Sequence, residues 1–245
     1  MRNLLTGLTE RALDGFYPRV CPAKGCGEAS DVPGRHVCWF CRSRIELYSE
    51  GLCAICGRFA EGNVGHSFVC GTCRQAKPHF DKARAAGRFT GVLRDVVHAF
   101  KYNDALWLKH DLVDLMQGCL AAHFEADAVD VIVPVPLHPA RQRERSYNQA
   151  AVLAEEIGNR LDRRVDKRAL VRARLTGSQT RLDAIHRRKN MLGAFAVRKP
   201  EWVCQRRVLL VDDVMTTGAT LSECARVLKK AGARTVWAVT VARGV

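Results

Sequence analysis

The clearest switch between apolar and polar positions lies near the carboxyl end of the chain. Four consecutive apolar residues at 208–211 predict a buried strand, and a short polar turn comes directly after them. Apolar side chains then recur at the spacing of one helix face: Leu221, Cys224, Ala225 and Leu228. A further apolar segment at 234–241 predicts a last strand. The pattern therefore indicates a strand, a turn, a helix and a second strand.

The same alternation recurs upstream. Strands are predicted at 82–90, 130–136, 168–172 and 193–197. Apolar residues at helical spacing predict three further helices: Val96, Val97 and Phe100 in the first, Leu108, Leu112, Leu115 and Cys119 in the second, and Val152, Leu153, Ile157 and Leu161 in the third. Polar residues 101–104 separate the first two helices. Strands that alternate with helices predict an α/β fold, in which helices flank a parallel sheet.

Four aromatic residues near the first two helices have two interpretations: Phe89, Phe100, Tyr102 and Trp107. Aromatic residues at helical spacing most often belong to a core. The alternative is a lid that stacks on a nucleobase. The sequence alone leaves both open.

The composition is ordinary for a globular protein, with 47% hydrophobic and 26% charged residues. No apolar run approaches 18 residues, which predicts no transmembrane helix, and charged residues interrupt the N-terminal segment where a signal peptide would be apolar. We therefore expect a cytoplasmic protein. The net charge of +14 is uneven, because 141–189 holds fourteen Lys/Arg against six Asp/Glu. Such a face either attracts a polyanion, a pyrophosphate or a nucleic acid, or is simply solvated.

Eight of the eleven cysteines fall between residues 21 and 73. They form one C-x4-C pair and three C-x2-C pairs, and in a reducing compartment this pattern favours metal over disulfides. Taken in order, the pairs predict two structural zinc sites: Cys21, Cys26, Cys38 and Cys41 in the first, and Cys53, Cys56, Cys70 and Cys73 in the second. His36 and His66 stand close enough in sequence to act as alternative ligands.

Two carboxylates and a threonine-rich turn lie between the strand at 208–211 and the helix after it. The first N–H groups of a helix have no intrahelical partner, and together with the helix dipole they favour an anion. The residues suited to a phosphate are Thr216, Thr217, Gly218, Ala219 and Thr220. Asp212 and Asp213 would repel a phosphate, but they can accept hydrogen bonds from sugar hydroxyls or help to hold a divalent metal. A ribose 5-phosphate meets these demands together.

A cationic loop comes after the predicted strand at 130–136. In a parallel sheet this loop would lie at the same edge as the acidic turn, where ligands bind. Arg141 and Arg145 are suited to bidentate contacts with a pyrophosphate, although a solvated helix N-terminus is the alternative. A second basic loop, 177–191, is long enough to form a lid and contains Arg187.

These segments resemble a known family. The stretch V-D-D-V-M-T-T-G-A-T at 211–220 resembles the phosphoribosyl-pyrophosphate (PRPP) motif of type I phosphoribosyltransferases. The stretch P-V-P-L-H-P-A-R-Q-R-E-R-S-Y-N-Q at 134–149 resembles the P-x-P-L…R-G-F-N-Q signature of ComF-type proteins, with Ser146 and Tyr147 in place of Gly and Phe. A third stretch resembles their Q-x-x-L…R-x-x-N…F pattern: Gln179, Leu182, Arg187, Asn190 and Phe195. The cysteine-rich segment resembles the double zinc ribbon of GntX-like members.

The resemblance implies a type I phosphoribosyltransferase fold that binds Mg-PRPP and transfers ribose 5-phosphate to an unknown acceptor, with release of pyrophosphate. It implies that the two acids hold the ribose hydroxyls and that the threonine loop wraps the 5-phosphate. The implied catalytic residues are Asp212, Asp213, Arg141, Arg145 and Arg187. Some relatives are linked to DNA uptake in competence. Thr216 stands where 6-oxopurine salvage enzymes have an Asp, which disfavours that activity.

The resemblance also suggests how the chain divides. The expected parts are a packing helix in 1–20, a double zinc-ribbon module in 21–80 and a phosphoribosyltransferase-like domain in 81–245, with 81–130 as hood and linker and 131–245 as core. For the helix, which Pro18 ends, membrane association is the weaker alternative.

Two rival functions remain. One is a non-catalytic sensor of PRPP or a nucleotide. The other is an accessory protein that grips single-stranded DNA with its zinc ribbons and basic loops. Few aromatic residues flank the arginines in the sequence, so no stacking platform is predicted.

Overall fold

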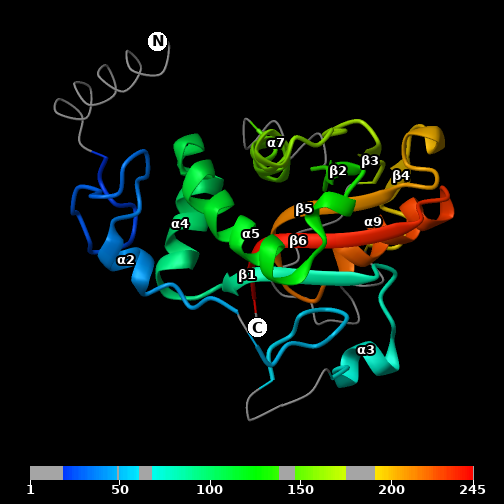
Figure 1. Cartoon of the computed structure of the whole chain (residues 1–245), viewed down its shortest axis with the longest axis horizontal. Helices are drawn as coiled ribbons and strands as arrows, with labels where there is room; N and C mark the ends of the chain where they lie inside the picture. Colours follow the sequence, from blue (N-terminus) through cyan, green and yellow to red (C-terminus); the bar gives the residue numbers. More distant parts are fainter. Residues whose placement is uncertain (1–18, 49, 61–67, 138–146, 175–190, 245) are drawn as a thin grey trace.

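The computed structural model describes residues 19–48, 50–60, 68–137, 147–174 and 191–244. They form an α/β fold on a four-stranded parallel sheet (Figure 1). In spatial order the strands are β1 (Lys82–Arg88), β6 (Thr235–Arg243), β5 (Arg207–Met215) and β2 (Val131–Pro134). The predicted fold class is confirmed.

Strand β5 is one of the two inner strands of the sheet, and its apolar run is buried on both faces. Residues Val208, Leu209, Leu210 and Val211 are all 0% exposed, as expected of a strand covered on both faces. The strand continues to Met215, four residues beyond the predicted end, by pairing with β6. Asp212 and Asp213 therefore lie within the strand and not in the turn after it, and Asp212 stands opposite Thr240.

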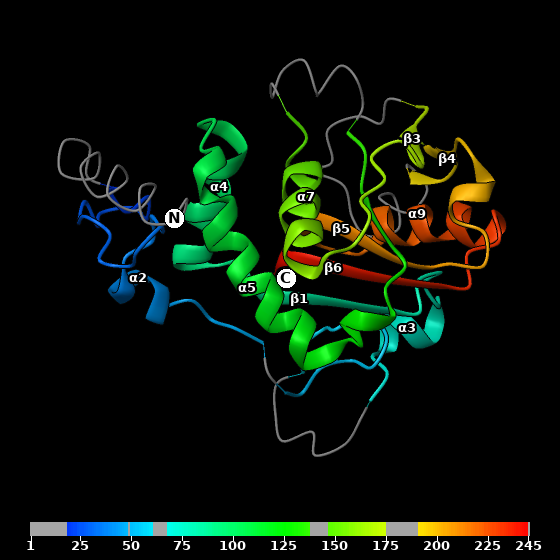
Figure 2. The same cartoon turned by 45° about the horizontal axis from the view of Figure 1, so that its top comes forward.

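Helices cover both faces of the sheet (Figure 2). Three of them share one core with Leu209 and Val211: α4 (Gly91–Tyr102), α5 (Lys109–His123) and α7 (Gln149–Leu161). On the other face α9 (Ala219–Lys230) packs with Val208 and Leu210. All four helices match the apolar spacing that predicts them. Of the aromatic residues with two interpretations, Phe100 is fully buried, whereas Tyr102 and Trp107 are exposed.

The smaller elements complete the chain. They are α2 (Trp39–Ser43), α3 (Gly71–Gln75), the antiparallel pair β3 (Leu170–Arg172) and β4 (Phe195–Val197), and 3-10 turns at Leu106–Leu108, Ala126–Ala128 and Pro200–Trp202. The short strands predicted at 168–172 and 193–197 are thus confirmed as a separate antiparallel pair. The helix predicted in residues 1–18 lies outside the described residues.

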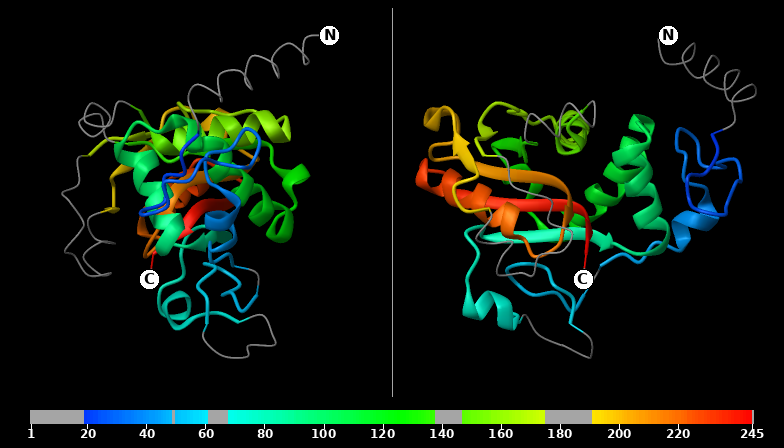
Figure 3. Two further views of the ribbon diagram at one scale, coloured as in Figure 1. Left: turned by 90° about the vertical axis from the view of Figure 1, so that its left-hand side faces the viewer. Right: turned by 180° about the vertical axis from the view of Figure 1, so that it is seen from behind.

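The chain between the two cysteine-rich segments lies along the outer edge of the sheet. The N–H of Tyr48 donates to the Ala86 oxygen at 3.0 Å, and the N–H of Arg88 donates to the Glu46 oxygen at 2.9 Å, so this segment pairs antiparallel with β1. A Cβ at Gly87 would lie 2.7 Å from the Glu46 oxygen, so the close approach requires glycine. The two cysteine-rich segments diverge from this crossing to separate places on the domain (Figure 3).

Candidate functional site

The paired acids sit near the carboxyl end of β5. The Asp213 N–H donates to Asp212 Oδ1 at 2.9 Å, and Asp213 is 9% exposed. Burial and the adjacent charge of Asp213 raise the pKa of Asp212 to about 7, against the opposing charges of Lys101 and Arg172. One of the two carboxylates is therefore only partly ionised at neutral pH, and a hydroxyl donor would favour its ionised form.

Lys101 completes this group, and no pattern in the sequence points to it. It stands in the last turn of α4, and its Nζ lies 2.9 Å from Asp213 Oδ1, with both side chains mostly buried. In the sequence the residue belongs to the polar break between two predicted helices. Only the packing of α4 beside the end of β5 turns that break into part of the site.

The threonine turn leads directly into α9. Gly218 has φ +77° and caps the helix in the left-handed region, which favours glycine. The Ala219 N–H donates to Thr217 Oγ1 at 3.3 Å, while Thr220 Oγ1 lies 3.6 Å from the sulfur of Met191. The first turn of α9 contains no acidic side chain. The helix N-terminus is thus electrostatically suited to an anion.

The loop after β2 emerges beside β5, because these strands are neighbours. Its far end is fixed by Asn148, which accepts from the Ala150 N–H at 3.0 Å and donates to the Val135 oxygen at 3.1 Å. A cavity of about 670 Å³ lies between this end and the β3–β4 pair, and Lys167, Arg172 and Arg198 contribute cationic groups to its wall. Three predicted catalytic residues lie outside the described residues: Arg141, Arg145 and Arg187.

The eight N-terminal cysteines gather into the two predicted groups of four: Cys21, Cys26, Cys38 and Cys41, and Cys53, Cys56, Cys70 and Cys73. Within each group all sulfur atoms lie within 4.8 Å of one another. The Sγ atoms of Cys26 and Cys38 are 3.7 Å apart, as are those of Cys56 and Cys70. Four thiolates on one tetrahedral zinc would be about 3.8 Å apart, given a Zn–S distance of about 2.3 Å. Both clusters therefore have the geometry to hold a metal ion.

Neither cluster needs the histidine ligands considered as alternatives. His36 approaches Asp111, with its Nδ1 3.9 Å from a carboxylate oxygen, and His66 lies outside the described residues. In the second cluster burial opposes ionisation of Cys53, but N–H groups of Cys70, Cys56 and Ile55 lower the pKa of this thiol to about 6. A lowered pKa favours the thiolate of Cys53, which is the form that binds metal, whereas burial raises the pKa of Cys56 and Cys73.

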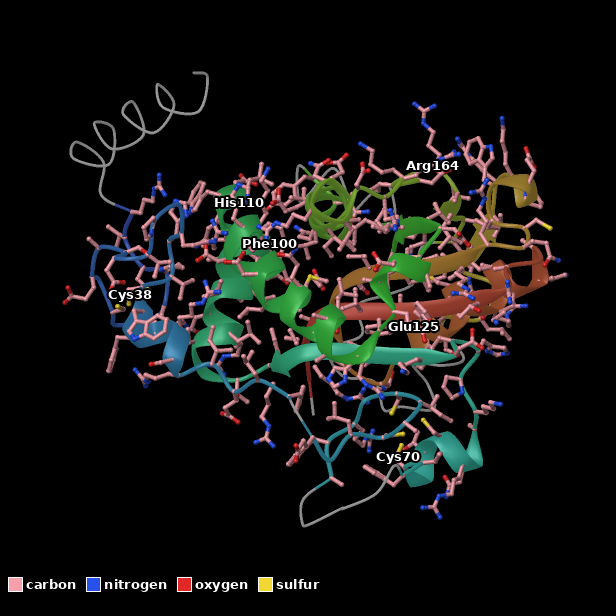
Figure 4. The ribbon with its side chains drawn as sticks, viewed as in Figure 1. Cys38, Cys70, Phe100, His110, Glu125 and Arg164 are labelled. Atoms are coloured by element: carbon pink, nitrogen blue, oxygen red, sulfur yellow. The ribbon has the colours of Figure 1, made fainter. Side chains whose placement is uncertain are left out.

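The first cluster packs on α4 and α5, away from the paired acids. Asp111 accepts hydrogen bonds from the N–H groups of His36 and Val37. Asp114 binds three guanidinium groups, with the closest contacts at 2.6 Å to Arg35, 3.2 Å to Arg42 and 2.8 Å to Arg160. Figure 4 shows Cys38 beyond α4 and Cys70 below the sheet, far apart on the molecule.

The second cluster packs on the sheet itself through two buried arginines. Arg84 on β1 donates to the oxygens of Cys53 and Ala54 at 3.2 Å each, and burial lowers its pKa. Arg243 on β6 is 4% exposed and donates to the Cys56 oxygen at 2.6 Å. The Cys53 oxygen also accepts from the Gly57 N–H at 2.9 Å, whereas Arg243 is the donor for the Cys56 oxygen.

The chain that leaves the second cluster reaches the threonine turn. The His79 N–H donates to Ser222 Oγ at 3.1 Å, and the Phe80 ring lies beside Gly218, at 3.7 Å from where a Cβ would be. Residues 76–79 and the turn also share a cavity of about 220 Å³. The second cluster is thus continuous with the candidate site, and the first is not.

The chain is similar to known proteins over most of its length. A family model described as "Phosphoribosyl transferase domain" matches residues 147–244. Over 222 residues the chain is 32% identical to "Competence protein F" of Haemophilus influenzae, covering 84% of this chain and 96% of that protein. It is 32% identical over 219 residues to "DNA utilization protein YhgH" of Salmonella typhi (84% and 95% covered) and 26% identical over 222 residues to "Competence protein ComFC" of Bacillus subtilis (86% and 85% covered). In the described part of the chain, no helix has the length and apolar character to cross a membrane.

Proposed function

This chain belongs to the ComF-like family of proteins with a phosphoribosyltransferase domain, and we propose that it binds PRPP with Mg²⁺ and transfers ribose 5-phosphate to an unidentified acceptor, releasing pyrophosphate. The observation that carries the proposal is the end of β5, where the paired acids lead through a left-handed glycine into the N-terminus of α9. The competence proteins among the relatives support a role linked to DNA uptake.

Each part of the ligand then has a partner of suitable chemistry. The 5-phosphate accepts from the N–H groups and hydroxyls of residues 216–220, and the ribose hydroxyls donate to Asp212 and Asp213. Mg²⁺, when bound, supplies charge neutralisation on the pyrophosphate. In the proposal, Arg141 and Arg145 hold the leaving pyrophosphate, and Arg187 excludes water from the site. In the proposal each cysteine cluster holds one structural zinc ion, because four thiolates leave no open coordination position for catalysis.

Calorimetric titration with Mg-PRPP tests the site. The double variant Asp212→Asn/Asp213→Asn should lower the affinity at least 100-fold, because a neutral amide accepts hydroxyls more weakly than a carboxylate. The matched control is Asp127→Asn/Asp162→Asn, which changes two acids on other elements. An unchanged affinity in the first variant would remove these acids from the proposal. Release of pyrophosphate in a screen of bases, amines and ammonia then separates a transferase from a sensor.

A second function, binding of single-stranded nucleic acid, is supported by one observation that the sequence does not provide. Trp39 and Phe40 on α2 are 64% and 66% exposed, and the Arg44 guanidinium lies 5.3 Å from the centre of the Phe40 ring. Exposed aromatic rings beside cations form a stacking platform. A labelled oligonucleotide should bind with an affinity that falls steeply with salt, and Trp39→Ala/Phe40→Ala should weaken it. Unaltered binding in that variant would exclude this surface.

A further inference from the structure

Lys101 lies between the start of α7 and the carboxyl end of β5. Its own carbonyl oxygen accepts from Gln149 Nε2 at 3.4 Å, and the hydroxyl of Tyr147 donates to the carbonyl oxygen of Phe100. Both donors stand where the loop after β2 enters α7. The backbone of the last turn of α4 is therefore fixed to Tyr147 and Gln149, while the Lys101 side chain reaches Asp213 on β5.

The ion pair with Asp213 adds little to a fold that already has large apolar cores. Desolvation of two charges offsets most of their attraction, so a buried pair is weak evidence for a stabilising role. The pair does matter for the charge of the site, because Asp212 and Asp213 are adjacent carboxylates that repel one another. Lys101 places a positive charge 2.9 Å from Asp213 Oδ1 and so offsets part of this repulsion.

A bound ribose and a pyrophosphate would change the partners on both sides of this pair. The ribose hydroxyls would take over the hydrogen bonds to Asp213, and the ammonium would then face a pyrophosphate, which carries several negative charges. Lysine can make this exchange, since its flexible four-carbon stem moves a compact charge with three donors. The backbone of residues 100 and 101 can stay in place meanwhile.

We propose that Lys101 is a pyrophosphate-binding residue that covers Asp213 in the free protein and turns to the pyrophosphate when PRPP binds. The inference rests on the proposed function, because it names a further contact to the same ligand. It assigns Lys101 to the diphosphate alone. Ribose 5-phosphate, which lacks the diphosphate, should gain nothing from the ammonium and should compete with it for Asp213.

The test compares two ligands on the full-length, metal-loaded protein. Calorimetry with Mg-PRPP and with ribose 5-phosphate gives two affinities for wild type, Lys101→Met and the control Lys109→Met. Lys109 is a neighbouring lysine whose Nζ lies 4.0 Å from Glu156, outside the site. Lys101→Met should weaken PRPP at least tenfold and leave ribose 5-phosphate unchanged or a few-fold tighter, while Lys109→Met alters neither. Lys101→Arg, which keeps the charge and changes its geometry, should recover part of the loss.

The outcomes separate this inference from the function beneath it. Wild-type protein that binds neither ligand overturns the proposed function and this inference together. Wild-type protein that binds both, with Lys101→Met weakening both equally or neither, overturns the role of Lys101 alone. If Lys101→Met does not fold, as judged by its thermal transition, the ratio of the two affinities in Lys101→Gln decides, because this variant removes the charge but keeps a hydrogen-bond donor for Asp213: a ratio equal to that of wild type contradicts the inference.

Discussion

The two tetracysteine clusters have the same ligands and different surroundings. The first packs on α4 and α5 through carboxylates that accept from its N–H groups and guanidinium groups. The second packs on β1 and β6 through arginines that donate to its carbonyl oxygens. Only the second continues into residues that contact the threonine turn. A metal knuckle is therefore a small structural unit whose role depends on the polar groups around it.

The knuckles also differ in what they expose. In the first, the residues between the two ligands of the second pair are Trp39 and Phe40, and in the second they are Gly71 and Thr72. The aromatic pair is far too exposed to stabilise the first cluster, since both rings are more than 60% accessible. The first cluster thus exposes two aromatic rings to solvent, whereas the chain after the second cluster contacts the threonine turn.

The strongest test of this comparison removes one metal at a time. Cys56→Ser/Cys70→Ser and Cys26→Ser/Cys38→Ser should each lose one of two zinc equivalents, as measured by metal analysis of the purified protein. The first variant should lose at least tenfold in affinity for ribose 5-phosphate, because the chain around Phe80 would no longer support the turn at Gly218. The second should stay within twofold of wild type. Equal losses in both would show that the clusters do not differ in this way.

Among the residues through which the two cysteine clusters contact the rest of the domain, Arg243 should cause the largest loss of stability when it is replaced. Arg243→Met leaves the Cys56 oxygen buried without its donor, which should lower the free energy of unfolding by about 2–3 kcal/mol. Arg35→Met at the first cluster should cost about 1 kcal/mol, because Asp114 keeps two other cations. Urea unfolding of the zinc-loaded variants measures both. A larger loss in Arg35→Met would reverse the ranking.

Asp114 makes the contact between the first cysteine cluster and α5 depend on pH, and with it the free energy of unfolding. Three guanidinium groups lower the pKa of this carboxyl from 3.8 to about 2, against the effect of burial. Its contribution, about 2 kcal/mol, is therefore complete above pH 4 and is lost as the pH falls from 4 towards 2. The difference in unfolding free energy between wild type and Asp114→Asn should be constant from pH 7 to 5 and shrink below 4. A constant difference down to pH 2 would contradict this account.

The smallest effect on stability is expected where the knuckles differ in sequence. Trp39→Gly/Phe40→Thr gives the first knuckle the residues of the second and should change the unfolding free energy by less than about 0.5 kcal/mol, since the rings are exposed. Metal content should not change either. If nucleic-acid binding depends on these rings, it should be lost in this variant alone. A loss of zinc would show that the rings support the metal instead.

Short-range patterns in the sequence predict much of the fold and only part of the site. Cysteine spacing is sufficient for the grouping within each cluster, and apolar runs locate the strands and helices. The end of β5 escapes prediction because Asp212 and Asp213 are polar, and only the neighbouring strand β6 keeps them in the sheet. Lys101 escapes for a similar reason, since its partner Asp213 is distant in the chain. Arg84 and Arg243, which donate to carbonyl oxygens of the second cluster, look like ordinary surface cations until the strand order is known.

The segment 46–48 has a consequence for how the protein behaves without metal. It pairs with part of β1 at one edge of the sheet. At the other edge Val165 pairs with Ile132 of β2. Each outer strand is therefore partly covered by another segment of the chain. The cover over β1 connects the two cysteine clusters, and metal ions bound there would hold its ends in place. Chelation would release this segment, and the uncovered strand could then pair with a strand of another molecule. Bound zinc would in that case also prevent self-association through β1.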